Sequence, residues 1–419
     1  MIAFLFAAVL VGQSAATGSA SPSGVVSEIR IQGNAVTPDE DVIRFAGLRV
    51  GAPFDAATIQ RAQASLEKSG RFEHVEVLQR FASLSDPSKV LIVIIVDEGP
   101  LTIEGKGAAQ RIVRSRGPHL LFMPVLGYEE GYGVTYGAQF AKANPAGPRS
   151  RLSFPLTWGG DKRAGVNFEK ELSRGPLTRV VTSFSVSRRT NPFFDEDDRR
   201  AHVSVRGERQ LFGNLNLGAT WTAEHVSFAD AGDRVITARL EATIDTRLDP
   251  MLARNAVYGH VGWDHVSVRD GVAAKRTSLE GRVYVGLIGQ SVLELRARRD
   301  SSDQPLPAYL QPLLGGMETL RGFRAGYAAG DTRVAGSAEL RVPLTSPLHV
   351  VKFGVSAFTD AGTVYASSAR LKDQSLDRGV GGGVWFAATV LRVSLDVAHG
   401  VGASTRVHVA ATMSFRNRH

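Results

Sequence analysis

The chain has 419 residues and a formal charge of +8; 21% of its residues are charged and 43% are hydrophobic. These proportions exclude a disordered chain, and no stretch after the first dozen residues approaches the ~20 apolar residues of a membrane-spanning helix. The lack of cysteine excludes disulfides, thiolate catalysis and cysteine-ligated metal sites. Lysine and arginine are scattered rather than clustered, so we expect no nucleic-acid partner.

The N-terminus has the features of a secretory signal. Residues 2–11 form an apolar run, IAFLFAAVLV, and small residues ending in Gly18-Ser19-Ala20 follow it. This is the pattern of a signal peptide and its cleavage site. We therefore assign residues 1–20 to a signal peptide and expect export; a buried N-terminal strand or helix is the alternative.

Residues 25–100 predict a small α+β domain with the element order β-α-α-β-β. Strands are predicted at 25–31, 72–81 and 89–96, and helices at about 38–46 and 56–68. In the second helix Ile59, Ala62 and Leu66 share one face, as expected for a helix that packs on a sheet. Because the helices cover one sheet face, a strand edge is left as a docking surface, where a partner strand pairs through main-chain hydrogen bonds.

The chain changes character after a linker at residues 101–118. From 119 to 419 helical periodicity disappears, and segments of about ten residues alternate apolar with polar side chains. In residues 235–243 one face carries Ile236, Ala238, Leu240 and Ala242, and the other carries Thr237, Arg239 and Glu241. A period of two is typical of a β-strand with one apolar and one polar face.

Sixteen such segments can be counted, an even number as expected for a bacterial transmembrane barrel. They are predicted near 119–127, 132–142, 150–158, 162–170, 178–188, 200–210, 215–227, 234–245, 256–268, 275–287, 291–300, 332–343, 350–360, 377–387, 390–399 and 405–415. The outer connections, which include 189–199, 228–233, 301–331 and 361–376, are longer than the inner ones, again typical of this class.

A soluble β-sandwich or propeller is the alternative to a membrane barrel. It is disfavoured because sixteen strands would enclose too large an interior for a packed core, and no blade-length repeat is present. The predicted fold is therefore mainly β: a sixteen-stranded transmembrane antiparallel β-barrel, residues 119–419, preceded by one small α+β domain.

The longest connection, residues 301–331, contains an arginine flanked by glycines. Gly315-Gly316 precedes Leu320-Arg321-Gly322-Phe323, and glycines allow tight or left-handed backbone at little steric cost. A long loop inside a compact β domain is usually functional. This loop is long enough to fold inside the barrel.

Two carboxylates are predicted to meet Arg321 there. By the alternation of their strands, Asp360 and Glu339 face the lumen, and Asp360 is expected to be the last inward residue of its strand. A guanidinium presents a rigid fork of donors that suits carboxylates. At about 4 Å and an effective dielectric near 20 the attraction is roughly 4 kcal/mol before desolvation. We predict that Arg321 folds back onto Asp360 and latches the loop.

The two halves of the chain resemble known bacterial modules. The phrases IRIQGN, LEKSGRFEHVEV and VLIVIIVDEGP are similar to a POTRA domain, the periplasmic module in front of certain outer-membrane barrels. The glycine-arginine motif, with Phe358-x-Asp360-x-Gly362 after it, resembles the motif pair of the BamA, TamA and two-partner-secretion transporter superfamily, the bacterial surface antigen family. Residues 245–250, DTRLDP, also resemble a family segment.

The resemblance implies an outer-membrane barrel with a periplasmic POTRA-like domain, in which the loop arginine contacts inward acidic residues of the following strands. The implied latch consists of Gly315, Gly316, Arg321, Gly322, Phe323, Glu339, Phe358, Asp360 and Gly362. Relatives that insert barrels carry several POTRA domains and secretion transporters usually carry two, whereas this chain has room for one.

Three functions are compatible with these observations. The preferred one is an assembly or insertion factor that takes client β-strands by pairing at the POTRA edge and at a seam between the first and last barrel strands. The alternatives are a pore for a secreted polypeptide, with loop 301–331 as its plug, and a passive structural barrel. The expected partners are outer-membrane lipid, unfolded outer-membrane or secreted client polypeptides, and periplasmic chaperones or accessory proteins.

Other motifs are interpreted as structural. Neither G-x-S-x-G nor H-E-x-x-H is present, so we expect no enzymatic activity and no cofactor or metal. The run 379–383, GVGGG, is read as small residues on a strand rather than a phosphate loop. The acidic run 195–198, DEDD, is read as a solvated outer loop rather than a cation site. His202, His260, His265 and His408 show no ligand spacing and are interpreted as ordinary barrel positions.

Overall fold

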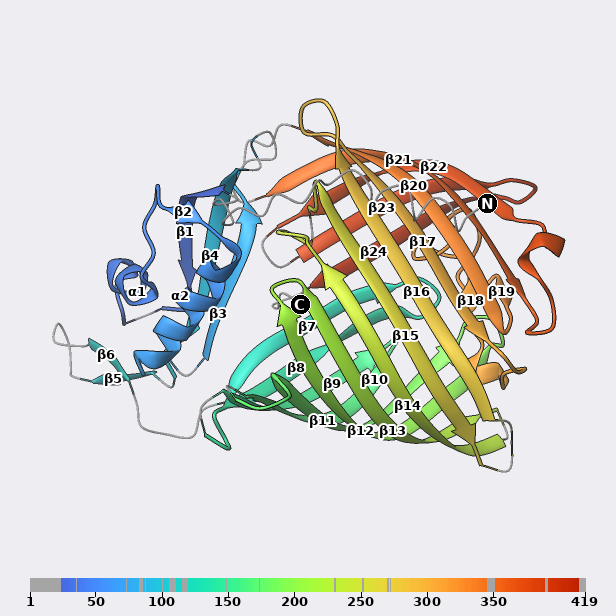
Figure 1. Cartoon of the computed structure of the whole chain (residues 1–419), viewed down its shortest axis with the longest axis horizontal. Coiled ribbons are helices and arrows are strands. Elements are labelled where there is room, and N and C mark those ends of the chain that lie inside the picture. The colour runs from blue at the N-terminus through green and yellow to red at the C-terminus, as the bar shows by residue number, and fades with distance from the viewer. Residues whose placement is uncertain are drawn as a thin grey trace.

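The structure is a computed structural model that describes residues 24–413, with breaks at 35, 73, 83–85, 87, 100, 105–110, 115–119, 148, 173, 230, 251, 270, 272, 345–350 and 389–390. The expected signal peptide and the end of the last expected strand lie outside the described residues. A small α+β domain lies at one end of a β-barrel (Figure 1).

The first domain contains two helices on a four-stranded sheet. Its elements are β1 (Gly24–Gln32), α1 (Asp39–Ala46), β2 (Pro53–Phe54), α2 (Ala56–Lys68), β3 (His74–Phe81) and β4 (Lys89–Asp97). The sheet order is β2-β1-β4-β3, with β1 and β4 parallel. The predicted element order is present, with the two-residue strand β2 in addition.

Local sequence explains the helix ends of this domain. Gly47 takes a left-handed conformation, φ 67°, after α1, a position where glycine avoids the strain of a Cβ atom. Asp55 and Thr58 form a capping box at the start of α2, which satisfies free backbone donors of the first turn. Leu66 of α2 is fully buried, with Phe54 and Ile92, in the core of the domain.

Along the chain, β5 (Leu101–Glu104) and β6 (Arg111–Arg114) follow the first domain and form a two-stranded antiparallel sheet. It lies in the segment 101–118 that we expected to be only a linker.

Sixteen of the strands that follow form a closed ring, which confirms the sixteen-stranded antiparallel barrel. They are β7 (Leu121–Glu129), β8 (Gly133–Ala143), β9 (Ser150–Gly159), β10 (Lys162–Glu171), β11 (Arg179–Asn191), β12 (Glu196–Phe212), β13 (Leu215–Phe228), β14 (Ala231–Asp245), β15 (Ala256–Val268), β16 (Ala273–Gly286), β17 (Val292–Ser302), β20 (Thr332–Leu344), β21 (Lys352–Tyr365), β22 (Asp377–Ala387), β23 (Leu391–Gly400) and β24 (Thr405–Met413).

The two faces of the wall differ in polarity as the alternation predicts. On β14, Ile236 and Leu240 are 49% and 58% exposed on the outer face, while Arg239 binds Asp264 of β15 on the other face of the wall. No helix among the described residues is long and apolar enough to cross a membrane.

Two of the predicted strand ends that differ from the structure concern candidate site residues. The strand expected to begin at residue 200 begins at Glu196, so most of the acidic run pairs with β11 rather than forming a loop. Asp360 is not the last inward residue of its strand, because β21 continues to Tyr365 in pairing with β20. In both cases a long neighbouring strand supplies backbone partners beyond the point where the side-chain alternation becomes irregular.

The predicted difference in length between outer and inner connections was wrong for most of them. Connections 192–195 and 229–230 on the outer side are shorter than 246–255 on the inner side, whereas 303–331 and 366–376 are long.

The first domain contacts the end of the barrel opposite to the connection 303–331. Arg80, at the end of β3, is 3.8 Å from Asp249 in the turn after β14, and Leu248 of that turn packs against the core of the first domain. Lys352, at the start of β21, donates to the carbonyl of Phe81 at 2.5 Å. The family-like segment 245–250 thus forms part of the interdomain contact.

Candidate functional site

The loop between β17 and β20, residues 303–331, is folded into a compact unit that we call the arginine loop. It contains a 3-10 turn (Ala308–Leu310) and a hairpin of β18 (Leu313–Leu314) with β19 (Ala328–Ala329). Leu314, Leu320 and Phe323 are buried together against Ala335 of the wall. The loop therefore has an apolar core of its own.

Glycines are required at the turns of this loop. Gly315 has φ 106°, and a Cβ atom there would lie 2.0 Å from the carbonyl oxygen of Arg324. Gly322 has φ 92°, and a Cβ atom would lie 2.5 Å from the backbone nitrogen of Gly400 at the end of β23. A side chain at either position would thus be both strained and obstructed.

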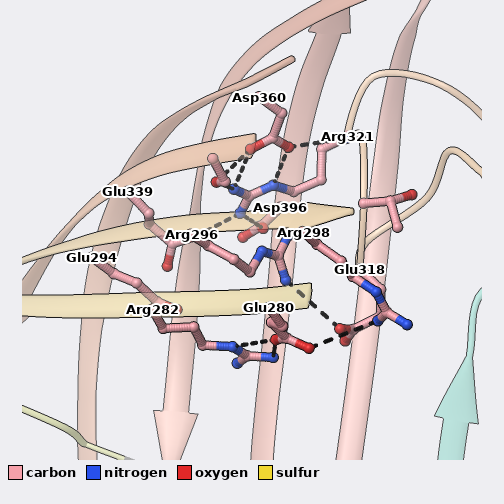
Figure 2. Close-up of polar contacts among 12 residues, drawn as sticks. Glu280, Arg282, Glu294, Arg296, Arg298, Glu318, Arg321, Glu339, Asp360 and Asp396 are labelled. Atoms are coloured by element: carbon pink, nitrogen blue, oxygen red, sulfur yellow. Dashed lines mark hydrogen bonds and ion pairs between the residues drawn. The ribbon is translucent and has the colours of Figure 1, made fainter. Parts of the chain in front are cut away.

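Arg321 lies at the centre of the site (Figure 2). Its Nε and Nη2 donate to the two oxygens of Asp360, both at 2.8 Å, and its backbone N–H donates to Asp360 Oδ2 at 3.0 Å. Nη1 donates to Glu339 Oε2 at 2.7 Å and to Asp396 Oδ2 at 2.9 Å. One guanidinium thus meets three carboxylates from three different strands, β20, β21 and β23.

The neighbouring wall extends this polar cluster. Arg341 of β20 donates to Glu339 Oε1 at 2.8 Å and also binds Glu294 of β17. Glu318 of the arginine loop lies 3.8 Å from Arg296 of β17, so the loop contacts the wall through a second ion pair (Figure 2).

Burial makes the Arg321 cluster energetically important. Arg321, Asp360 and Asp396 are 3%, 2% and 2% exposed. Removal of one partner of a buried, hydrogen-bonded ion pair commonly costs ~3–5 kcal/mol, because the other charge is left without compensation. The contacts of Arg321 therefore resist detachment of the loop from the wall.

The second predicted motif forms the surface on which Arg321 lies. Phe358, Asp360 and Gly362 share one face of β21, and the guanidinium carbon of Arg321 is 3.3 Å from the centre of the Phe358 ring, as in a cation–π contact. A Cβ atom at Gly362 would lie 2.9 Å from a methyl carbon of Leu314. Within five residues, this motif provides a ring beneath the guanidinium (Phe358), a carboxylate that binds it (Asp360) and space for the side chain of Leu314 (Gly362).

The glycine run on β22 has a role that sequence reasoning did not find. A Cβ atom at Gly379 would lie 1.9 Å from the carbonyl oxygen of Arg321, and one at Gly383 would lie 2.0 Å from Asp396 Oδ1. Gly381 approaches the ring of Phe358 in the same way. These small residues leave room for the arginine loop inside the barrel.

The structure brings together all nine residues of the predicted latch, including Gly316, whose backbone N–H donates to the carbonyl of Phe323 at 2.9 Å. It adds three residues that were not predicted. Ser337 donates to Asp360 Oδ1 at 2.6 Å and accepts from Arg321 Nη2 at 3.1 Å. Asp396 lies on the polar face that alternation assigned to the lumen, but no local signal linked it to Arg321. His408 accepts a hydrogen bond from the backbone N–H of Gly322 at 2.8 Å, which no spacing rule indicated.

The acidic run is occupied by arginines rather than arranged for a cation. Asp197 binds Arg188 and Arg199, and Asp198 binds Arg200 through both of its oxygens. Among the residues that the structure describes, no group of three or more acidic, histidine or cysteine side chains could hold a metal ion.

Comparisons with known proteins agree with this architecture. Residues 131–410 match the Omp85 superfamily domain, and residues 24–99 match the POTRA family described as the surface antigen variable number repeat. A comparison with curated proteins gives no match.

Solved structures with this fold include BamA from Haemophilus ducreyi lacking POTRA domains 1–3. It is 16% identical, with a TM-score of 0.61, and the match covers 93% of this chain and 84% of that one. CdiB from Acinetobacter baumannii is 12% identical, with a TM-score of 0.50, and covers 93% of this chain and 74% of that one. The family matches span both domains, and we conclude that the chain is an outer-membrane β-barrel protein of the Omp85 superfamily, with a POTRA domain in the periplasm.

Proposed function

We propose that this protein assembles β-barrels into the outer membrane by pairing with client strands at the seam between β7 and β24. The observation that carries the proposal is a free strand edge. Residues 405–410 of β24 pair with β23, but within the described part of the chain β24 pairs with β7 only at Ala411–Tyr128 and Thr412–Gly127. The first strand ends at Glu129, before it reaches the rest of β24.

A free edge of this kind offers backbone donors and acceptors to another strand. In a lipid bilayer an unpaired backbone group is costly, because no water is present to bind it. A client strand that paired with residues 405–410 would therefore gain hydrogen bonds on both partners. The outward residues of this edge are apolar, with Val407 61% exposed, as required for a strand that borders lipid.

The POTRA domain supplies a second edge on the periplasmic side. Strand β3 is the last strand of its sheet, and its end is held against the barrel by the contacts of Arg80 and Phe81. Strand addition at β3 would bring an unfolded client, or a periplasmic chaperone or accessory protein, to the entrance of the barrel.

A reversible lock on the seam tests this proposal. The chain has no cysteine, so the pair Tyr128→Cys and Ala411→Cys can close the seam with a single disulfide. The matched control is Leu395→Cys with Val409→Cys, which joins β23 to β24 at another directly opposed pair. Both proteins are reconstituted in liposomes, unfolded outer-membrane barrels are added, and their folding is followed by protease protection.

We expect the seam lock to abolish acceleration of client folding and a reductant to restore it, whereas the control lock leaves it unchanged. Equal activity of the locked and reduced seam variant would overturn the proposal.

A polypeptide secretion pore is the second candidate, because the arginine loop lies inside the lumen. Arg324 donates to the carbonyl of Pro192 after β11 at 2.7 Å, and Ala325 packs closely against Gly131. The loop thus reaches from β20–β23 to the opposite part of the wall. Transport of an added unfolded polypeptide across the liposome, without its insertion as a barrel, would favour this candidate.

A further inference from the structure

A buried histidine lies where the arginine loop meets the seam. His408 is on β24, within the edge that has no backbone pairing to β7 in the described residues, and its side chain is fully buried. Its Nδ1 is 2.5 Å from Oε2 of Glu130, the residue that directly follows β7. A side-chain contact therefore joins the two strands beyond their last backbone pair.

The hydrogen bonds of this histidine define its tautomer. The backbone N–H of Gly322 points at His408 Nε2, with a nitrogen–nitrogen distance of 2.8 Å. Because a backbone N–H can only donate, Nε2 must be the unprotonated acceptor, and the ring proton lies on Nδ1. Nδ1 then donates to the carboxylate of Glu130, a charge-assisted hydrogen bond.

The hydrogen bonds of His408 are connected to the Arg321 cluster. Gly322 follows Arg321 directly, and His408 is the cross-strand neighbour of Asp396, which accepts from Arg321 Nη1. The arginine loop therefore contacts β23 and β24 at adjacent positions, one through a guanidinium and one through a backbone N–H. The backbone of Gly322 lies close to that of Gly400 at the end of β23 when the loop is seated.

We propose that His408 is a positioning residue that closes the outer part of the seam when the arginine loop is seated. With the loop in place, Gly322 orients the ring so that Nδ1 points at Glu130 and holds the end of β7 against β24. When the loop leaves, the ring loses this orientation and β7 is released. We call the contacts of Gly322, His408 and Glu130 the clamp. Its importance for client insertion rests on the proposed function, whereas its effect on seam opening does not.

Amide hydrogen exchange of the reconstituted full-length protein measures opening of the seam directly. Exchange is followed by mass spectrometry in residues 121–129 and 405–413, with β14 as an internal reference. The variants are His408→Leu, which removes both hydrogen bonds, and His408→Gln, whose amide oxygen can accept from Gly322 and whose amide NH2 can donate to Glu130. The matched control is His260→Leu, because His260 binds Thr243 on the wall away from the seam.

We expect His408→Leu to speed seam exchange about tenfold, the effect of losing one charge-assisted hydrogen bond. His408→Gln should restore most of the protection, and His260→Leu should leave the seam unchanged. Arg321→Ala should also speed seam exchange, and adding His408→Leu to it should have little further effect, because both act through the same contact.

Seam exchange that is the same in His408→Leu and in the parent would overturn the clamp. If His408→Leu does not fold, the test uses Glu130→Leu, which removes the acceptor of the His408 Nδ1–H. Unchanged seam exchange in that variant also overturns the clamp. Faster seam exchange with unchanged client folding would retain the clamp and argue against insertion at the seam.

Discussion

Two junctions of the barrel differ in the contacts that join their strands: the wall against which the arginine loop packs, and the seam between β7 and β24. Strands β20 and β21 pair from Thr332–Tyr365 to Leu344–Phe353 without a break, and Arg321 adds a buried ion-pair cluster on their inner face. At the seam, the described residues show two backbone pairs and one side-chain bridge, His408 with Glu130. Within the described residues, the outer end of the junction at 405–410 therefore lacks the backbone pairing that the wall has along its whole length.

This contrast indicates where the protein can open. Opening a strand pair costs the free energy of its hydrogen bonds and of the side chains packed across it. We therefore expect the outer end of the seam, where residues 405–410 have no backbone pair to β7 in the described part of the chain, to open before the wall. On the wall itself, the buried ion pairs of Arg321 are the contacts most costly to lose. Substitutions within the Arg321 cluster should destabilise the folded barrel more than comparable substitutions elsewhere on the wall.

The largest effect is expected for Arg321→Ala. It leaves Asp360 and Asp396 buried without their cation, and it should lower the free energy of unfolding in lipid vesicles by ~3–5 kcal/mol. The control is Arg188→Ala, which breaks a surface pair with Asp197 in which the arginine side chain is 48% exposed; it should leave the free energy of unfolding nearly unchanged. Similar costs for the two variants would contradict the central role of Arg321.

A smaller effect is expected for Gly379→Ala. The added methyl group would lie 1.9 Å from the carbonyl oxygen of Arg321, so the loop must shift, and overpacking of this kind costs about 1–3 kcal/mol. Denaturant unfolding and protease cleavage within the loop measure both consequences. Gly213→Ala is the control, because no atom lies within 4 Å of a Cβ there; a loop equally protected in both variants would argue against close seating.

Phe358→Leu should be weaker again. It keeps an apolar side chain on β21 but removes the ring beneath Arg321, a contact worth about 1–2 kcal/mol when it is desolvated. Unfolding measurements should show this loss, whereas Phe386→Leu, on the lipid-facing side of β22 with 37% exposure, should change less. A larger loss at Phe386 would show that ring area, rather than the cation, determines the effect.

The smallest effect is expected for Ser337→Ala. Its hydroxyl donates to Asp360 and accepts from Arg321, and loss of such hydrogen bonds costs about 0.5–1.5 kcal/mol. Ser301→Ala, which removes an exposed hydrogen bond to Thr277, should be close to neutral in the same unfolding experiment. Indistinguishable results would mean that the carboxylate of Asp360 is held sufficiently without the serine.

The sequence by itself determined the sixteen-stranded barrel, the α+β domain before it and the pairing partners proposed for Arg321. These inferences depend on local properties: alternation with period two along a strand, helical spacing in residues 56–68, and glycines around one arginine. Asp360 and Glu339 could be proposed as partners because alternation places them on the polar face, and a guanidinium inside a barrel requires carboxylates.

Only the tertiary structure decided which distant residues complete the cluster. Asp396 is 75 residues from Arg321, and Glu130 is 278 residues from His408. No local pattern encodes such distances, because they depend on the closure of the ring and on the course of the loop within it. Closure brings β24 beside β7, the folded loop carries Gly322 to His408, and residues that looked ordinary in sequence become the contacts that join the loop to the seam.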